Sequence, residues 1–284
     1  MRGMHHRFRI GTWPAVILSD GPLTLHAPQE VLLDAPPEAL AAALAEAGQP
    51  TDRLRVQQNL LLLDLPGHRV LFDTGLGTAR LFGEESGRLP DSLADAGIDA
   101  ASITDVVLTH AHSDHAWGLS AEDGTPNFPN ARIHLADIEY AHWTDPALLA
   151  AGNNSARGVQ RHLVPLRDRI RLLREGKDPL PGIAALRTPG HTPGHTSYLI
   201  GAGAGALLLI GDAAFHAPGS LAFPASRSRY DTDPAQAIAT RTALLARIAD
   251  EGRRVIGYHY PFPGLGRIER SGAAFRFRPC TPRV

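Results

Sequence analysis

Three histidines and one aspartate fall within the six positions 110–115, where the sequence reads His-Ala-His-Ser-Asp-His. Imidazole nitrogens and carboxylate oxygens are the ligands that zinc and related divalent cations accept in proteins. Four such ligands would fill one tetrahedral site and leave no position for the exchangeable water that a catalytic metal needs. If the chain is an enzyme, we therefore expect His110, His112, Asp114 and His115 to be divided between two metals.

Three further candidate ligands, His195, Asp212 and His259, lie far along the chain from this segment. Taken singly, each has an ordinary explanation, because a glycine-flanked aspartate is usually a turn residue and a lone histidine usually lies on the surface. Together with the segment 110–115 they make five histidines and two aspartates, enough for two metals. The single cysteine, Cys280, offers neither a disulfide nor a cysteine metal site, so histidines and carboxylates must supply the ligands.

Each candidate ligand follows a short apolar run that predicts a strand. The segment 110–115 directly follows residues 104–108, which are too few for a helix. Loops at strand ends are where a rigid scaffold usually displays its chemistry. The runs that precede the other three candidates are 183–186, 206–210 and 254–257.

Strand-rich and helix-rich stretches occur twice along the chain, which favours two sheets packed face to face with helices outside each, a four-layer αββα sandwich of the α/β class. A single domain over residues 1–284 is expected, with a short N-terminal arm at about residues 1–7. Further strands are predicted over Arg7–Ser19 and Val56–Leu65, the second continuing through Pro66-Gly67 into a hairpin. Helices are predicted over 36–47, 89–96, 157–174 and, with Asp233 as N-cap, 233–249.

Composition argues against several classes of partner. The formal net charge of −1 leaves no surplus of Lys and Arg to neutralise nucleic-acid phosphates or an anionic membrane surface. No apolar run approaches the ~20 residues needed to span a bilayer, and the N-terminal residues lack the pattern of a signal peptide, so a cytoplasmic location is expected. The chain also lacks a Gly-x-Ser-x-Gly nucleophile elbow, which again favours metal chemistry.

The order of these motifs resembles that of the metallo-β-lactamase fold superfamily. The motifs that carry the resemblance are Thr109–His115 with Trp117-Gly118-Leu119, the Thr-Pro-Gly-His-Thr-Pro-Gly-His segment 188–195, Gly211-Asp212, Tyr258-His259, and Asp73 within Leu71–Gly75. Within the superfamily, the segments 127–131 and 259–266 resemble the branch that contains methyl parathion hydrolase and related quorum-quenching lactonases. The resemblance runs from about Phe8 to Phe277.

This resemblance implies an αββα fold with two divalent metal ions in a groove at one edge of the sheets. It implies that His110, His112 and His195 hold the first ion. Asp114, His115 and His259 would hold the second, and Asp212 would bridge the two. Zinc is the expected metal, with manganese, iron and cobalt as alternatives because the same ligands accept them. His191 is expected to lie beside the site as a structural residue, and Asp73 to orient a ligand imidazole.

The expected reaction is hydrolysis of a lactone, an aryl ester or an organophosphate ester by a hydroxide shared between the metals, with Asp114 and Asp212 as catalytic residues. Lactonases of the superfamily that act on acyl-homoserine lactones often carry a tyrosine three residues after the bridging aspartate, where this chain has Phe215. Phe215, Trp143 and Phe223 are expected to wall an apolar substrate pocket, although each could equally fill the core. The alternative function is an iron-dependent redox enzyme on the same fold, and the resemblance also implies a homodimer.

Overall fold

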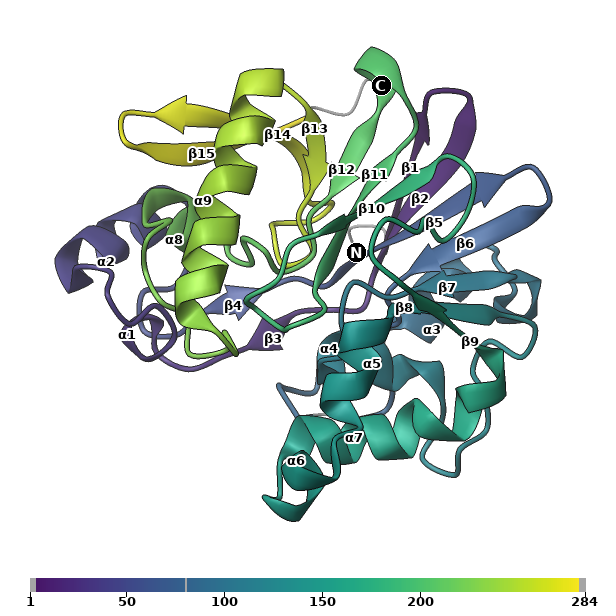
Figure 1. Cartoon of the computed structure of the whole chain (residues 1–284). Helices are drawn as coiled ribbons and strands as arrows, with labels where there is room; N and C mark the ends of the chain where they lie inside the picture. The colour runs from purple at the N-terminus through teal and green to yellow at the C-terminus, as the bar shows by residue number, and fades with distance from the viewer. Residues whose placement is uncertain (1–3, 80, 281–284) are drawn as a thin grey trace.

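The computed structural model describes residues 4–79 and 81–280. Two large sheets face each other, and helices cover the outer side of each one (Figure 1). The predicted four-layer αββα arrangement is therefore confirmed. Figure 1 shows α9 (Pro234–Glu251) on the outer face of the second sheet, and α5 (Asp137–Trp143) with α7 (Asn154–His162) on the side of the first.

The first sheet has seven strands in the order β1-β2-β5-β6-β7-β8-β9. The four strands from β6 to β9 run parallel to one another, and the other pairings are antiparallel. The strands are β1 (His5–Ile10), β2 (Trp13–Ser19), β5 (Asn59–Leu65), β6 (His68–Phe72), β7 (Asp105–Val107), β8 (Arg132–Ala136) and β9 (Ile170–Leu173).

The second sheet has six strands in the order β10-β11-β12-β13-β14-β15, and only its pair β12 and β13 is parallel. A separate two-stranded ribbon pairs β3 with β4. The strands are β10 (Ile183–Arg187), β11 (Thr196–Ile200), β12 (Leu207–Leu209), β13 (Arg254–Ile256), β14 (Leu265–Ser271), β15 (Ala274–Pro279), β3 (Leu23–Thr24) and β4 (Arg55–Val56).

The longest helix, α9, begins where the sequence predicts. The side chain of Asp233 accepts a hydrogen bond from the Gln236 amide at 3.0 Å, which satisfies one of the free donors of the first turn. No helix formed by the described residues is long and apolar enough to cross a membrane. The remaining α-helices are α1 (Pro28–Val31), α2 (Pro37–Glu46), α3 (Leu89–Asp95), α4 (Ser113–Ala116), α6 (Pro146–Ala150) and α8 (Ala217–Ala222). The 3-10 turns are η1 (Ala100–Ser102), η2 (Trp117–Leu119), η3 (Val164–Arg169) and η4 (Gly203–Gly205).

Strand β5 shows why the chain forms layers. Its four consecutive leucines are all buried, because both faces of the sheet are covered. Leu61 and Leu63 pack in the core between the two sheets, whereas Leu60 and Leu62 pack in the core beneath the helices. Successive residues of a strand point to opposite faces, so this run supplies two layers of core at once.

Three sequence predictions are wrong in detail. The strand predicted over Arg7–Ser19 is two strands, β1 and β2, because the chain turns at Gly11 with φ of +59°. Residues 5–7, predicted as part of an arm, belong to β1, and residues 1–3 lie outside the described residues. The helix predicted over 157–174 ends at His162, since Pro165 cannot donate a helical hydrogen bond, and the chain continues through η3 into β9.

Candidate metal centre

The loops that follow β7, β12 and β13 meet at one edge of the two sheets, together with the loop between β10 and β11. The segment 110–115 follows β7, and Asp212 and His259 follow β12 and β13. The loop between β10 and β11 carries both His191 and His195. All of these candidate side chains except His112 are buried, and His112 is partly buried.

Three imidazoles form the first candidate ligand group, His110, His112 and His191. The Nδ1 atom of His112 lies 3.1 Å from Nε2 of His110 and 3.0 Å from Nε2 of His191. Three imidazoles with ring nitrogens this close together are a donor set that fits a divalent transition metal.

The second candidate ligand group contains one carboxylate and two imidazoles, from Asp114, His115 and His259. The Oδ2 atom of Asp114 lies 3.3 Å from Nε2 of His259 and 3.6 Å from Nε2 of His115. The four ligands predicted from the segment 110–115 thus contribute to both groups. A third group of His110, His115 and Asp212 overlaps the two.

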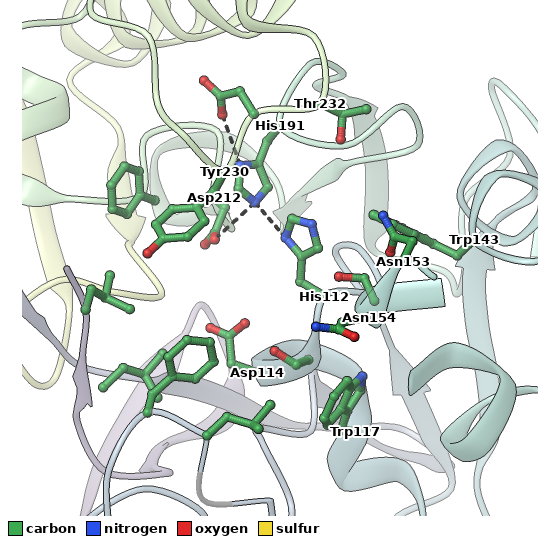
Figure 2. A pocket seen from close by; sticks show the side chains of 18 of the residues that line it. His112, Asp114, Trp117, Trp143, Asn153, Asn154, His191, Asp212, Tyr230 and Thr232 are labelled. Atoms are coloured by element: carbon green, nitrogen blue, oxygen red, sulfur yellow. Dashed lines mark hydrogen bonds and ion pairs between the residues drawn. The ribbon is translucent and has the colours of Figure 1, made fainter. Parts of the chain in front are cut away.

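Asp212 joins the two groups. Its Oδ2 atom lies 3.4 Å from Nε2 of His191 in the first group, and 3.4 Å and 3.5 Å from Nε2 of His259 and His115 in the second. Figure 2 shows Asp212 between His191 and Asp114. A carboxylate in this position is placed to bridge two cations.

The structure reverses the roles expected for His191 and His195. His195 has both ring nitrogens engaged, because Nε2 accepts a hydrogen bond from the Asp212 amide at 2.9 Å and Nδ1 lies 2.8 Å from Oγ1 of Thr188. His191 instead directs Nε2 toward His112 and Asp212. The prediction that His195 is the ligand and His191 its structural neighbour is therefore not what the geometry supports.

Two glycines shape the loop that carries His191 and His195. Gly190 has φ of +125°, and a Cβ there would lie 2.2 Å from the Ala237 amide nitrogen of α9. A Cβ on Gly194 would lie 2.4 Å from the backbone nitrogen of Glu139. Both glycines thus let the loop that carries His191 and His195 pack closely against its neighbours.

The outer nitrogens of most of these imidazoles are held by partners, and this orients the rings. Asp73 contacts Nδ1 of His115 at 3.0 Å and also accepts from the Thr109 amide at 2.8 Å, as expected for an orienting aspartate. Nδ1 of His259 donates to the Gln57 carbonyl at 2.7 Å. Asp231, which no sequence motif indicated, lies 3.1 Å from Nδ1 of His191.

Buried Glu139 connects the two halves of the site and was also missed by the sequence analysis. Its carboxylate accepts from the Ala111 amide at 2.9 Å, from Nε1 of Trp143 at 2.7 Å and from the Gly194 amide at 2.9 Å. It therefore holds the loop after β7 against the loop that carries His191.

The electrostatics of the centre fit two bound cations. Burial and the nearby imidazole of His191 lower the pKa of His112 to about 3, so this ring is neutral and able to coordinate. Burial opposes charge on His259 as well, but Asp212 and Asp114 raise its pKa to about 10. His115 is raised well above its ordinary pKa in the same way, against its burial, by Asp114 and Asp212. Nε2 of His115 and Oδ1 of Asp212 are buried without hydrogen-bond partners among the described residues, which is consistent with atoms that bind a cation.

The centre forms part of the wall of a cavity of about 680 Å³. Trp143 and Phe215 line this cavity, as expected, while Trp143 also binds Glu139. Phe223 does not line it, and instead packs against the apolar cluster that contains Leu40. The sequence could not distinguish these outcomes, because an aromatic ring suits an apolar cavity wall and an apolar core equally well.

Comparison with known proteins identifies the family of the chain. The family model described as the metallo-beta-lactamase superfamily matches residues 53–259. The chain belongs to the metallo-beta-lactamase superfamily. It is 29% identical over 116 residues to an N-acyl homoserine lactonase of a Bacillus species, which covers 41% of this chain and 40% of that protein. It is 28% identical over 177 residues to a probable metallo-hydrolase of Mycobacterium tuberculosis, covering 53% and 49% of the two chains. The chain thus spans about half or less of these relatives' lengths.

Solved structures of other superfamily members match over almost the whole chain. AidC, a dizinc quorum-quenching lactonase solved with the product N-hexanoyl-L-homoserine, superposes with a TM-score of 0.90 at 27% identity, covering 98% of this chain and 97% of AidC. The hydrolase AbOPH superposes with a TM-score of 0.91 at 24% identity over the full length of both chains, which shows the shared fold. The similarity to quorum-quenching lactonases confirms the branch that the sequence motifs resembled.

An experiment can distinguish which of His191 and His195 is a metal ligand. We expect His191→Ala to lower the bound metal from about two ions per chain toward one, because it removes a ligand nitrogen. His195→Ala should retain more metal but unfold at lower temperature, since the buried Asp212 amide loses its acceptor at a cost of about 1–3 kcal/mol. Elemental analysis and thermal unfolding of both variants measure this. The opposite pattern of metal loss would restore His195 as the ligand.

Proposed function

We propose that this chain is a dinuclear metal-dependent hydrolase that opens lactones or related carboxylic esters. The observation that carries the proposal is the convergence, at the wall of a large cavity, of two candidate ligand groups that both contact the carboxylate of Asp212. The proposed metal ligands are His110, His112, His191, Asp114, His115, His259 and Asp212.

The residues of the centre would have distinct roles in the reaction. Divalent cations at the two groups, zinc in the first instance, would supply Lewis acidity and an acidified water. Asp114 and Asp212 both line the cavity beside the reaction centre, so we assign them as the catalytic carboxylates. There they would position the attacking water and accept the proton that it loses. The neutral ring of His112, which also lines the cavity, leaves its side of the site free of competing protons.

Lactones are the favoured substrate class within this proposal. AidC, similar over nearly its full length, is a lactonase, and so are several partial matches from Bacillus. A ring-opening hydrolysis needs room for one ester and its substituents, and the cavity volume is in the range of small-molecule sites. Aryl esters and organophosphate esters are further candidates because they need the same stabilisation of charge on oxygen.

The test combines metal quantification with a substrate panel on the purified, metal-loaded chain. The panel contains γ- and δ-lactones, acyl-homoserine lactones, p-nitrophenyl esters and a methyl parathion-like triester. We expect about two divalent ions per chain and measurable turnover of at least one lactone or ester. Stoichiometric iron with a visible absorption band would favour the redox alternative. Full metal occupancy without turnover of any member would contradict the proposal.

We also propose that the chain acts as one hydrolase domain, because both sheets supply candidate ligands to one centre. Homodimer formation stays a prediction from the family resemblance. Size-exclusion chromatography with light scattering measures it directly, and a monomer at micromolar concentration would contradict it.

A further inference from the structure

Arg241 of α9 is 1% exposed, although an arginine is almost never fully buried in a protein unless its charge is paired. Among the residues that the structure describes, the only carboxylate that pairs with its guanidinium belongs to Asp231, at 3.8 Å. The Asp231 side chain is itself 2% exposed. Two opposite charges are therefore buried together, and the negative one contacts His191, a candidate metal ligand.

The guanidinium of Arg241 is held in one position because each of its three nitrogens has a partner. Nε donates to the Pro224 carbonyl at 2.8 Å, and Nη2 donates to the Ser226 carbonyl at 2.6 Å. The third nitrogen, Nη1, is the one that faces Asp231. A planar guanidinium that is fixed at two nitrogens cannot turn the third one away. Arg241 therefore places a fixed positive charge beside the Asp231 carboxylate.

Asp231 connects this charge to the metal centre. Its Oδ1 atom lies 3.1 Å from Nδ1 of His191. An ionised carboxylate can only accept a hydrogen bond, so Nδ1 of His191 is the donor, and Nε2 is the nitrogen left to bind a metal. Nε2 lies 3.0 Å from Nδ1 of His112 and 3.4 Å from Oδ2 of Asp212, contacts that Figure 2 marks. The contacts thus run from Arg241 through Asp231 to His191 and the other candidate ligands.

Helix α9 also holds the loop between β10 and β11. The Thr240 hydroxyl donates to the Pro189 carbonyl at 2.7 Å. At the start of the helix, the Asp233 amide donates to the Gly190 carbonyl at 2.9 Å. Pro189 and Gly190 directly precede His191 in that loop. The helix that carries the buried arginine is therefore attached to the loop that carries the candidate ligand, which keeps the spacing between them fixed.

We propose that Arg241 is a positioning residue for the metal ion of the first ligand group. It compensates the charge of Asp231, and through that carboxylate it holds the His191 ring with Nε2 toward the ion. The inference rests on the proposed dinuclear centre. It adds to the residues that determine metal affinity one that touches neither a metal nor a ligand imidazole.

The charge of Arg241 matters because its removal leaves a buried carboxylate without a counter-ion. The Ser228 amide donates to Oδ2 of Asp231 at 3.3 Å, but one amide does not compensate a full charge. An unpaired buried charge is among the costliest defects in a folded protein, so the surroundings rearrange to hydrate it. Asp231 would then leave His191, and the imidazole would lose the partner that orients it.

The test measures zinc binding and needs no substrate. Metal-free wild type and Arg241→Gln are titrated with zinc in competition with a chromophoric chelator, which resolves the binding of the two ions. Glutamine removes the charge but can still donate to one of the two carbonyls. We expect the affinity for one ion to fall on the order of 10- to 100-fold, the usual effect of losing a residue that orients a metal ligand, and that for the other to change less than about threefold.

Arg241→Lys retains the charge but not the planar fork, so a smaller loss of zinc affinity, about three- to tenfold, is expected. An equal loss in the two variants would overturn the role of charge. If Arg241→Gln does not fold, Arg241→Lys is compared with the wild type alone, and unchanged zinc affinity in that comparison would overturn the inference.

The matched control is Leu245→Ala, which shortens a fully buried side chain on the same helix. This variant opens a cavity in the core and should lower the melting temperature, as Arg241→Gln also should. It alters no contact between Arg241 and His191, so its zinc affinity should stay within about twofold of the wild type. A loss of zinc affinity as large as in Arg241→Gln would overturn the inference, because it would mark a general effect of a loosened helix.

A double variant shows whether Arg241 acts through Asp231. In Asp231→Asn the carboxylate is already absent, so adding Arg241→Gln should lower the zinc affinity by less than about threefold further. If the effects of the two substitutions multiply instead, Arg241 acts independently of Asp231 and the inference is wrong.

Zinc binding by the wild type separates this inference from the proposed function. A wild type that binds fewer than two ions contradicts the dinuclear centre, and both proposals fail. A wild type that binds two ions but turns over no substrate of the panel contradicts only the proposed function, since the comparison with Arg241→Gln stays valid. Two ions bound with equal affinity by both proteins would overturn only the role of Arg241.

Discussion

Replacing Asp212 by alanine is expected to reduce kcat/KM on the order of 10³-fold or more, the scale on which loss of a central charge-stabilising group acts. Among the residues that the structure describes, Asp212 is the one whose carboxylate oxygen lies within 3.5 Å of histidines from both ligand groups. Without it, the two groups lose their shared ligand and His115 and His259 lose a counter-charge. Initial rates with the best lactone or ester, at saturating zinc, measure the effect.

The matched control for this variant is Asp250→Ala. Asp250 lies on the surface and pairs with Arg270 at 2.9 Å, so its removal should change activity and stability very little. Elemental analysis should show that Asp212→Ala holds less metal than Asp250→Ala. Retention of more than a tenth of wild-type activity by Asp212→Ala would contradict the bridging role.

Removal of metal is expected to abolish turnover and to lower the melting temperature. Metals that bind only the folded chain stabilise it in proportion to their binding free energy, which is large for a site with several preorganised ligands. Turnover and the melting temperature are measured before and after dialysis against EDTA, and again after addition of zinc. Both should fall and then recover. Full activity in a preparation shown to be metal-free would contradict the proposed chemistry.

The stabilisation by metal should increase between pH 6 and pH 9. In the metal-free chain the pKa of His259 is raised to about 10 and that of His115 is also raised. Their protonation therefore contributes stability that is fully present below the ordinary histidine pKa of about 6.5 and is lost as pH rises through the raised values. A bound cation must displace these protons, so competition is strongest at low pH. A zinc-induced shift in melting temperature that is independent of pH would contradict this linkage.

The part of the site that is local in sequence could be predicted from the sequence. Residues 110–115 follow one strand, so their spacing alone brings several ligands to one place. The choice between His191 and His195 could not be made in this way. It depends on how the loop packs against α9 and α5 through Gly190 and Gly194, contacts that join residues 47 and 55 positions apart.

The sequence analysis did not predict some other features, because the sequence patterns that indicate them are weak or depend on distant residues. Tyr230 and Asp231 come from an irregular segment with no motif, and only its attachment to His191 brings them to the cavity. Strand β9 was read as helix because its apolar residues also fit helical spacing. The four layers, in contrast, followed from the repeated alternation of strand-rich and helix-rich stretches, which depends on many residues at once.

The ligand groups draw on both sheets, with the segment 110–115 from one and His191, Asp212 and His259 from the other. Bound ions would therefore cross-link residues up to 149 positions apart, from His110 to His259. Because the ions would bind only the folded chain, this cross-link would stabilise the native state by the free energy of metal binding. Amide hydrogen exchange should accordingly slow at the ends of β7, β12 and β13 together when zinc is added, and slowing confined to one sheet would show that the halves are not coupled.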